Sequence, residues 1–299
     1  MLKLKNDTFV LSMCKSHKPV ATTRSGDTVI FETLDCFSNK LVTTNHKLSD
    51  VAWSDINPAT GPLFIEDAIK GDTLKVEIID IQIAEQGVIC SAPGFGVFGH
   101  ILEKETTKII PIKDGKALFN ENLQFPINPM IGVIGTAPET EDIPTGSPGF
   151  HGANMDCNKI TKGSTLYLPV FNDGALLSMG DVHAIMGDGE VVVCGVEIAA
   201  EITVRVSVIK NCFLPLPFLI NEEKAMTLYS ASTLDEAAKG ATLNMQEFVT
   251  TALGMSIDES AMLLSISADL SICQMVDPLM TVRMELPRWI LDQYGYQFN

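Results

Sequence analysis

The densest group of polar side chains lies in a glycine-rich stretch from Gly146 to Cys157. His151, Asn154 and Asp156 stand there among glycines that let the backbone turn sharply and approach another group closely. Histidine and aspartate can bind a metal ion or move a proton, and an asparagine amide can donate a hydrogen bond. The stretch is therefore a candidate site on an irregular loop, with a turn held only by local hydrogen bonds as the alternative.

A second group of ionisable residues follows farther along the chain. Asp181 and His183 are two positions apart, a spacing that in a strand points both side chains to one face. Two such groups beside an apolar run are costly unless they are paired or bound, so we predict that they share a site. Asp188 and the glycine after it predict a tight turn, and Glu190 begins a strand that we expect over residues 189–195.

Two isolated residues are also candidates. Glu139 ends a buried-looking strand over residues 131–139, where a carboxylate can serve as an acid or a base. A solvated loop is the competing interpretation of Glu139. His46 lies in a polar segment with no second histidine nearby, so it is either a site residue or an ordinary surface histidine.

The seven cysteines contain no C-x-x-C pair and are widely spaced. This pattern argues against a disulfide framework and against a zinc cluster made of thiolates. Free thiols suit a reducing compartment. The sequence also lacks the serine nucleophile elbow, the P-loop and the His-Glu-x-x-His motif, so it offers no standard covalent or nucleotide chemistry.

The chain carries a formal net charge of −16, from 37 acidic and 21 basic residues. A negative field repels phosphates, so we expect neither nucleic acid nor an anionic membrane as a partner. The same field favours neutral or cationic substrates and bound cations. No apolar run has the length of a signal peptide or of a membrane helix, so we expect a cytoplasmic protein.

The elements that must position these residues are mainly strands as far as about residue 208. Residues 73–83 alternate apolar and polar side chains at first, with Leu74, Val76 and Ile78 on one face, which predicts a half-buried strand. Residues 200–208 alternate in the same way, and 28–33 and 164–170 are rich in residues typical of strands. Glycine and proline interrupt the strands about every dozen residues, and this pattern favours a β-sandwich or a barrel.

The pattern changes near residue 221. Apolar residues three or four apart predict an amphipathic helix over residues 234–253, followed by a glycine where a helix stops. A second helix is predicted to about residue 267, then strands around 270–274 and 279–285 and a final helical turn. We therefore predict a β-rich body over residues 1–220, carrying most site residues, with an α+β part over 221–299 packed on it.

The order of several segments resembles the acetamidase/formamidase family over about residues 55–285. The resemblance rests on these segments: Asn57-Pro58-x-Thr60-Gly61-Pro62, Gly71-Asp72-Thr73-Leu74, Gly132-x-Ile134-Gly135-x-Ala137-Pro138, His151-Gly152-Ala153-Asn154-Met155-Asp156-Cys157, Gly180-Asp181-x-His183, Gly187-Asp188-Gly189-Glu190 and Ala268-Asp269-Leu270-x-Ile272-x-Gln274-x-Val276-Asp277-Pro278. Two positions depart from the family pattern, because Ala153 replaces a usual glycine and Met186 a common glutamine.

The resemblance implies a jelly-roll-like body and hydrolysis of short amides such as formamide or acetamide to ammonia and a carboxylate. Zinc would lower the pKa of a bound water and polarise the amide carbonyl. Our hypothesis gives Asp156, His183 and His46 the role of metal ligands. Glu139 is the predicted general base, and Asn154 the predicted donor to the substrate oxygen.

Other interpretations stay open at the level of sequence. Asp181, Asp188 and Glu190 would instead hold a second or structural ion, with calcium as the candidate. Cys157 would be the nucleophile of a covalent route. The substrate would otherwise be a different or cyclic amide, or the chain a non-catalytic β-sandwich binding protein. The apolar composition favours a homodimer.

Overall fold

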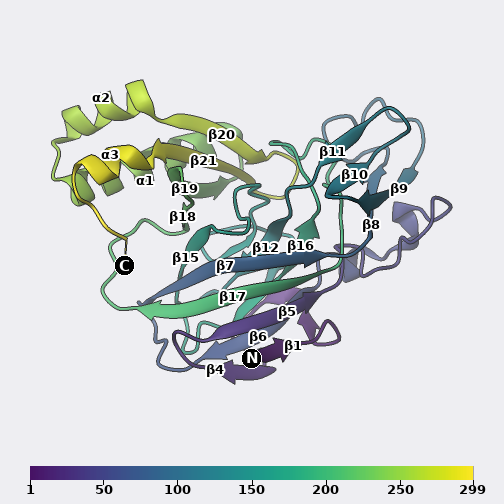
Figure 1. Cartoon of the computed structure of the whole chain (residues 1–299), viewed down its shortest axis with the longest axis horizontal. Helices are drawn as coiled ribbons and strands as arrows, with labels where there is room; N and C mark the ends of the chain where they lie inside the picture. The colour runs from purple at the N-terminus through teal and green to yellow at the C-terminus, as the bar shows by residue number, and fades with distance from the viewer. Residues whose placement is uncertain (299) are drawn as a thin grey trace.

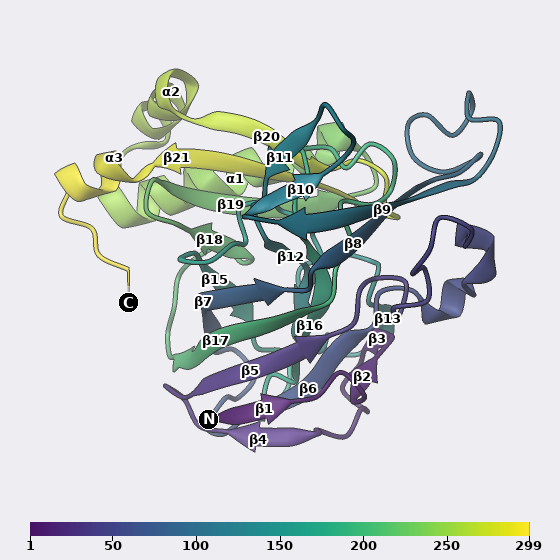
Figure 2. The ribbon, with the colours of Figure 1, turned by 45° about the vertical axis from the view of Figure 1, so that its right-hand side comes forward.

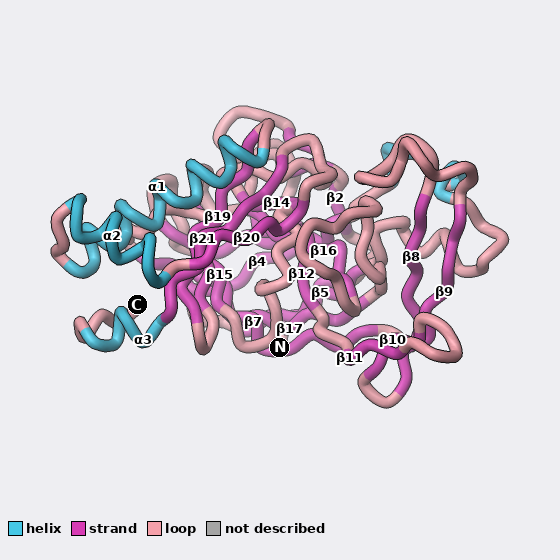
Figure 3. Tube along the Cα trace, turned by 90° about the horizontal axis from the view of Figure 1, so that it is seen from above, coloured by secondary structure: helices cyan, strands magenta, loops and turns pink. Residues whose placement is uncertain are grey.

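The structure is a computed structural model that describes residues 1–298. Strands make up most of its regular structure, and the three α-helices of the described residues lie in the C-terminal part of the chain (Figures 1 and 3). The prediction of a mainly β protein with an α+β C-terminal part is confirmed. None of the helices in residues 1–298 is long and apolar enough to cross a membrane.

The largest sheet has nine strands in the order β1-β5-β17-β7-β15-β18-β19-β21-β20. Its two longest strands pair antiparallel across the middle of the molecule, as Figure 1 shows. The strands are β1 Leu2–Leu4, β5 Thr28–Thr33, β7 Thr73–Ile83, β15 Thr165–Pro169, β17 Ala200–Ile209, β18 Phe218–Ile220, β19 Lys224–Ala231, β20 Asp269–Gln274 and β21 Met280–Pro287.

A second sheet of β14-β12-β16-β6-β2, with β4 beside β6, faces the first. Side chains of both sheets form one core, which joins Val76 of β7 and Val204 of β17 to Ile134 and Met179. The bounds are β2 Phe9–Val10, β4 Ala21–Thr23, β6 Ala59–Ile65, β12 Met130–Gly135, β14 Gly152–Asn154 and β16 Leu177–His183. Two sheets around one core make a sandwich, and no sheet of residues 1–298 closes into a barrel.

Burial explains why β12 and β16 differ from the alternating strands. Every residue of both strands is buried. A strand covered on both faces reads as a continuous apolar run, so a polar residue in it stands out. Asp181 and His183 of β16 are such residues, and the strand carries them into the interior.

Smaller elements project from the sandwich. A four-stranded sheet in the order β11-β10-β9-β8 extends away from it (Figure 2). Its strands are β8 Gln86–Ser91, β9 Thr106–Lys113, β10 Lys116–Leu118 and β11 Gln124–Pro126. Strands β3 Ser12–Met13 and β13 Ile143–Pro144 form a short pair, and two 3-10 turns, η1 Leu48–Asp50 and η2 Trp53–Asp55, lie between β5 and β6.

The C-terminal part packs its helices on the large sheet. Helix α1 spans Leu234–Leu253 as predicted, begins at the capping hydroxyl of Thr233 and ends at Gly254, whose φ of 66° only glycine adopts freely. It packs on β19 and β21 over a second apolar core. Helices α2 Ile257–Ser267 and α3 Arg288–Gln293 follow.

The predicted division after residue 220 stays a prediction. The nine-stranded sheet continues across this position, since β18 before it pairs with β19 after it. One predicted strand is wrong. Residues 189–195 form turns and isolated bridges instead, since Glu190 and Val193 adopt φ values of 48° and 79° that no strand accommodates. That departure matters, because it folds Glu190 back toward β16.

Candidate active site

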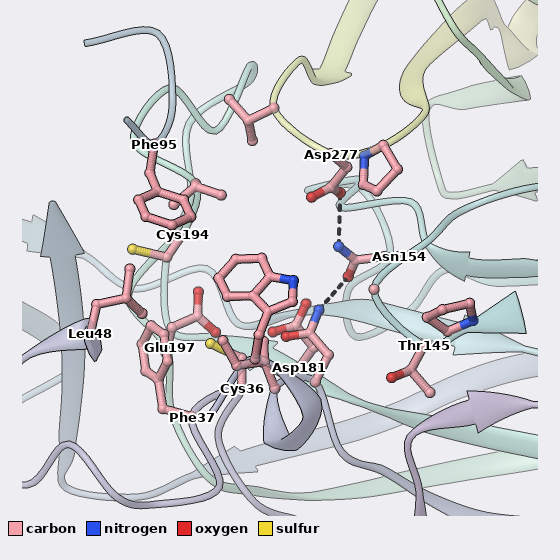
Figure 4. Close-up of a pocket in the computed structure, with 18 of the residues that line it drawn as sticks. Cys36, Phe37, Leu48, Phe95, Thr145, Asn154, Asp181, Cys194, Glu197 and Asp277 are labelled. Atoms are coloured by element: carbon pink, nitrogen blue, oxygen red, sulfur yellow. Dashed lines mark hydrogen bonds between the residues drawn. The ribbon is translucent and has the colours of Figure 1, made fainter. Parts of the chain in front are cut away.

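A cavity of about 730 Å³ opens beside the buried end of β16. Its lining comes from segments far apart in the sequence, which include the 36–57 region, the loop after β8 and residues 276–278. The carboxylate and carboxamide side chains of the lining are Asn57, Asn154, Asp181, Glu190, Glu197 and Asp277. Figure 4 shows Asn154 and Asp277 on one side of the cavity, Glu197 on the other, and Asp181 between them.

His183 lies at the centre of a buried group of carboxylates. Its Nε2 atom lies 2.9 Å from Glu197, 3.5 Å from Asp181, 3.9 Å from Asp156 and 4.0 Å from Glu190, measured to the nearest carboxylate oxygen. All five residues are at most 6% exposed. We name these five residues the carboxylate–histidine cluster.

Neighbouring strands bring the cluster together. Val133 of β12 pairs with Asn154 of β14 on one side and with Gly180 of β16 on the other. Asp156 follows β14, so it lies beside Asp181 across β12. The chain then returns from the turns after β16, and Glu197 forms a bridge with His183.

Glycines make room for these side chains. A Cβ atom on Gly132 would overlap carboxylate oxygens of both Asp156 and Asp181. A Cβ on Gly195 would lie 2.7 Å from Nδ1 of His183. Real Cβ atoms do not approach so closely, so the cluster depends on these two residues having no side chain.

Backbone strain is concentrated at the same place. Asp156, Asp181 and Glu190 have φ values of 42°, 54° and 48°, in the left-handed region that non-glycine residues seldom adopt. Such conformations persist only where the surrounding structure holds them, and they gather at functional sites. Three strained carboxylates around one histidine point to a site that binds something.

The charges of the cluster are strongly coupled. Burial and the neighbouring carboxylates raise the pKa of Asp156 and of Glu190 well above their ordinary values. Burial raises the pKa of Glu197 to about 7. Burial opposes the charged form of His183, yet the carboxylates of Glu197 and Asp181 outweigh it and raise its pKa well above the ordinary value.

Several polar atoms of the cluster have no hydrogen-bond partner. They are both oxygens of Asp156, both ring nitrogens of His183 and Oε2 of Glu197. Two sets of three ligand atoms lie close enough to hold an ion, namely Asp156 with His183 and Glu190, and Cys36 with Asp181 and Glu197. Because buried polar groups are almost always satisfied, unpaired carboxylate oxygens and imidazole nitrogens fit a bound cation.

Asn154 and Asp277 line the cavity next to the carboxylate–histidine cluster and are hydrogen-bonded to each other. Asn57 donates a hydrogen bond to Asn154 (3.2 Å), and Nδ2 of Asn154 donates one to Asp277 (2.8 Å). Burial raises the pKa of Asp277 to about 7. Asp277 belongs to neither set of ligand atoms, so its carboxylate is available to a molecule in the cavity.

Comparison with known proteins places this arrangement in a family. The model of the acetamidase/formamidase family matches residues 15–145 and 140–293. The chain belongs to the acetamidase/formamidase family. The resemblance inferred from the ordered sequence segments is thereby confirmed.

Relatives in the acetamidase/formamidase family support the assignment. A structure of an acetamidase from Bacillus halodurans is 46% identical, with a TM-score of 0.97 over 98% of this chain and 100% of that one. An acetamidase structure from Yersinia enterocolitica is 31% identical, with a TM-score of 0.92 over 97% and 92% of the two chains. A putative formamidase of Schizosaccharomyces pombe is 27% identical, over 62% of this chain and 60% of its own length. This chain thus spans about three fifths of that relative's length.

The structure brings together most of the site residues predicted for this family member. Asp156, His183, Asp181 and Glu190 are all in the carboxylate–histidine cluster, and Asn154 lines the adjoining cavity. Ala153 adopts a φ of 66°, a conformation that glycine adopts more readily than alanine.

Three predicted residues lie elsewhere. Glu139 is exposed beyond the end of β12 and forms an ion pair with Lys70 at the surface, so it cannot act as a base in this cavity. His46 is half-buried in a loop, where its Nδ1 accepts from the backbone of Val42 (3.1 Å), and it belongs to neither ligand set.

Asp188 is the third of these residues. Its two oxygens accept hydrogen bonds from the guanidinium of Arg283, at 2.7 and 2.8 Å. The predicted ion site of Asp181, Asp188 and Glu190 is therefore not assembled, because Asp188 is occupied by this pair. Asp188 instead holds the turn before Glu190 against the large sheet, since Arg283 lies on β21.

The cysteines that line the cavity are poor nucleophiles, and Cys157 does not reach it. Cys157 is fully buried and lies outside the cavity lining. The thiols that line the cavity belong to Cys36, Cys90 and Cys194, and burial raises the pKa of all three, to about 11 for Cys90. A thiol that stays protonated at neutral pH is a weak nucleophile.

Two members of the site escaped the sequence analysis. Glu197 stands between Val196 and Ile198, and a single carboxylate inside an apolar run is a signal that could have singled it out. Asp277 lies in the C-terminal segment that carried the family resemblance, but nothing in its spacing connects it to residues 154–183.

Proposed function

We propose that this chain hydrolyses a primary amide to a carboxylate and ammonia, with a divalent cation bound in the carboxylate–histidine cluster. The observation that carries the proposal is His183, enclosed by four carboxylates within 4.0 Å, three of which, Asp181, Glu190 and Glu197, line the cavity. Family membership and the acetamidase structures support the amide as substrate.

The ligand atoms fit zinc. Asp156, His183 and Glu190 would supply oxygen and nitrogen ligands, and a second ion would find Asp181, Glu197 and the sulfur of Cys36. Sulfur is a soft ligand that zinc accepts and calcium avoids, so the second set favours zinc over calcium. When bound, the ion would lower the pKa of a water molecule and polarise the amide carbonyl.

The remaining residues would hold the substrate and move protons. Nδ2 of Asn154 carries a second hydrogen besides the one donated to Asp277, and this hydrogen is free for the substrate carbonyl oxygen. Asp277 would accept a proton from the attacking water as the new carbon–oxygen bond forms. It would return that proton to the nitrogen as the carbon–nitrogen bond breaks, so that ammonia leaves.

This assignment moves the base from Glu139 to Asp277. A general base must lie within hydrogen-bond reach of the water that it activates. Asp277 lines the cavity and contacts Asn154, whereas Glu139 is paired with Lys70 on the surface. A purely binding role is less consistent with the cluster, since strained and unpaired buried carboxylates destabilise a fold that does not use them.

We also propose that the chain works in the cytoplasm as a homodimer. All seven cysteines are free in the structure, which suits a reducing compartment. Helix α2 exposes Ile257, Met262 and Ile266, an apolar surface of the kind that subunits bury. Light scattering on purified protein measures the mass directly, and a monomer at micromolar concentration would reject the dimer.

Ammonia release from formamide and acetamide tests the activity. Purified protein is assayed as isolated, after removal of metal by a chelator, and after addition of zinc. We expect turnover that disappears with the chelator and returns with zinc. Turnover that survives complete removal of metal would reject the metal-dependent route, and ammonia from neither amide would reject both as substrates.

A further inference from the structure

The cavity is much larger than the small amides of the proposed function. Its volume is about 730 Å³. A water molecule occupies about 30 Å³ of liquid, so an amide of three or four heavy atoms needs on the order of 100 Å³. Pockets of roughly 300–1,000 Å³ usually hold ligands of drug-like size. The space therefore has room for an acyl group far longer than that of acetamide.

The additional space has an apolar wall. Figure 4 shows Phe37, Leu48 and Phe95 together on one side of the cavity, opposite Asn154 and Asp277. These side chains come from the segments after β5 and β8, whereas Asp181 lies on β16 and Glu197 follows it in the chain. An amide group held at Asn154 would thus direct its acyl chain toward aromatic and aliphatic side chains.

Trp53 extends this wall to the mouth of the cavity. Its ring centroid lies 5.4 Å from that of Phe95, with an angle of 31° between the ring planes. The indole nevertheless remains 63% exposed, although it belongs to the lining. A large, mostly exposed aromatic side chain at a pocket entrance has a free face on which a flat ligand group can stack.

The charges of the cavity restrict the ligand further. The lining contains Asp181, Glu190, Glu197 and Asp277, and no lysine, arginine or histidine occurs among its described residues. Away from the proposed metal ion, a carboxylate or phosphate on the substrate would find no basic side chain of the lining to pair with and would meet the charge of Asp277. The lining therefore disfavours an acyl group with a negative charge, and its apolar wall favours an apolar one.

We propose that the substrate is a primary amide whose acyl chain ends in an aromatic ring, an arylalkyl amide, with the ring stacked on the free face of Trp53 beside Phe95. The proposal rests on the proposed amide hydrolysis and specifies its substrate. The carboxylate–histidine cluster and Asp277 act on the amide, and the apolar wall selects the acyl group. A single additional methylene in an apolar pocket changes kcat/KM by roughly 10–200-fold, so a buried ring should have a large effect.

The test compares acetamide with 3-phenylpropionamide as substrates of zinc-loaded protein. We expect kcat/KM to be at least about tenfold higher for 3-phenylpropionamide. Trp53→Ala should lower the value for 3-phenylpropionamide about tenfold more than the value for acetamide. Trp289→Ala is the matched control, because Trp289 is the other tryptophan, is also 63% exposed, and lies outside the cavity on α3.

Equal or lower efficiency on 3-phenylpropionamide would overturn the proposal, as would equal losses on both amides in Trp53→Ala. If neither amide releases ammonia, the proposed function fails, and calorimetric binding of 3-phenylpropionamide then decides the specificity separately. Binding that Trp53→Ala weakens and Trp289→Ala preserves would support the apolar wall as the acyl site. No binding to the wild type would overturn it.

Discussion

The Nε2 atom of His183 lies 2.9 Å from Oε1 of Glu197, and both side chains are at most 1% exposed. The backbone amide of Gly195 donates to the same oxygen of Glu197 at 2.8 Å, which fixes the carboxylate beside the imidazole. Nδ1 of His183 and the other oxygen of Glu197 have no hydrogen-bond partner, and the contact of Nε2 with Glu197 is an ion pair without hydrogen-bond geometry. Buried ionisable atoms without partners are costly, so the cluster should depend on a bound metal ion.

Asp156→Asn should remove the metal and the activity together. The substitution keeps the size of the side chain but takes away a charged ligand of the Asp156, His183 and Glu190 set. We expect bound zinc per chain to fall at least tenfold and ammonia release to fall about 100-fold. Elemental analysis and the ammonia assay measure the two effects, and a variant that keeps full metal and full turnover would contradict the ligand assignment.

Asp277→Asn should reduce kcat without loss of metal. Removing a general base typically lowers the rate by roughly 10²–10⁴-fold, and Asp277 belongs to neither ligand set. Glu139→Gln is the control, because Glu139 lies on the surface with Lys70 and should change kcat less than about twofold. The opposite result, an inactive Glu139→Gln and an active Asp277→Asn, would restore the base predicted from sequence.

Gly132→Ala should displace two members of the carboxylate–histidine cluster. The new methyl group would overlap the carboxylate oxygens of Asp156 and Asp181, so both side chains would have to shift. We expect folded protein with at least tenfold less bound zinc and ammonia release. Gly187→Ala is the matched control, since no atom lies within 4 Å of its added Cβ. Equal metal content in the two variants would show that the close packing is not required.

Asp188→Ala should destabilise the fold by about 2 kcal/mol. It removes the bidentate partner of Arg283, whose side chain is only 2% exposed. The loss should stay below the roughly 3–5 kcal/mol of a fully buried pair, because Asp188 is 41% exposed and Glu285 remains 2.6 Å from the guanidinium. Urea unfolding measures the change. Lys70→Ala, which breaks an exposed pair, should cost less than about 1 kcal/mol.

His151 should make the protein less stable in mild acid. Burial lowers its pKa to about 4, against 6.5 for an ordinary histidine. Below pH 6.5 the imidazole of His151 is therefore protonated in the unfolded chain but stays neutral in the folded chain. The free energy of unfolding decreases as the pH falls from 6.5 toward 4. The full effect is about 3 kcal/mol.

The measurement for His151 is the free energy of unfolding at pH 7 and pH 4.5 for wild type and His151→Gln. The variant should lose less stability over this interval than the wild type. His100→Gln, at an exposed position, should retain the wild-type dependence. An unchanged pH dependence in His151→Gln would mean that this histidine is not the group that titrates.

Local pattern was enough to predict most of the regular elements. Alternation that is strict at the start of residues 73–83 predicted β7, and apolar spacing with capping residues predicted the bounds of α1. These features depend on neighbours in the chain, since the period of a strand or helix decides which side chains share a face. The spacing of Asp181 and His183 likewise placed two members of the cluster on one strand.

Tertiary structure alone decided the rest of the site. Glu139 and Glu197 are both carboxylates near apolar segments, yet one lies at the surface beside Lys70 and the other beside His183. Asp277 reaches Asn154 only because β20 and β21 bring the C-terminal segment across the sandwich.

The sequence by itself therefore determined the class of fold, the family and the candidate residues with local signals. Which carboxylates meet depended on sheet pairing and on left-handed turns at Asp156, Asp181 and Glu190. Such contacts join residues far apart in the chain, and their energy comes from burial and charge in the folded state. No pattern of adjacent residues encodes them, so only the assembled structure shows which groups share the site.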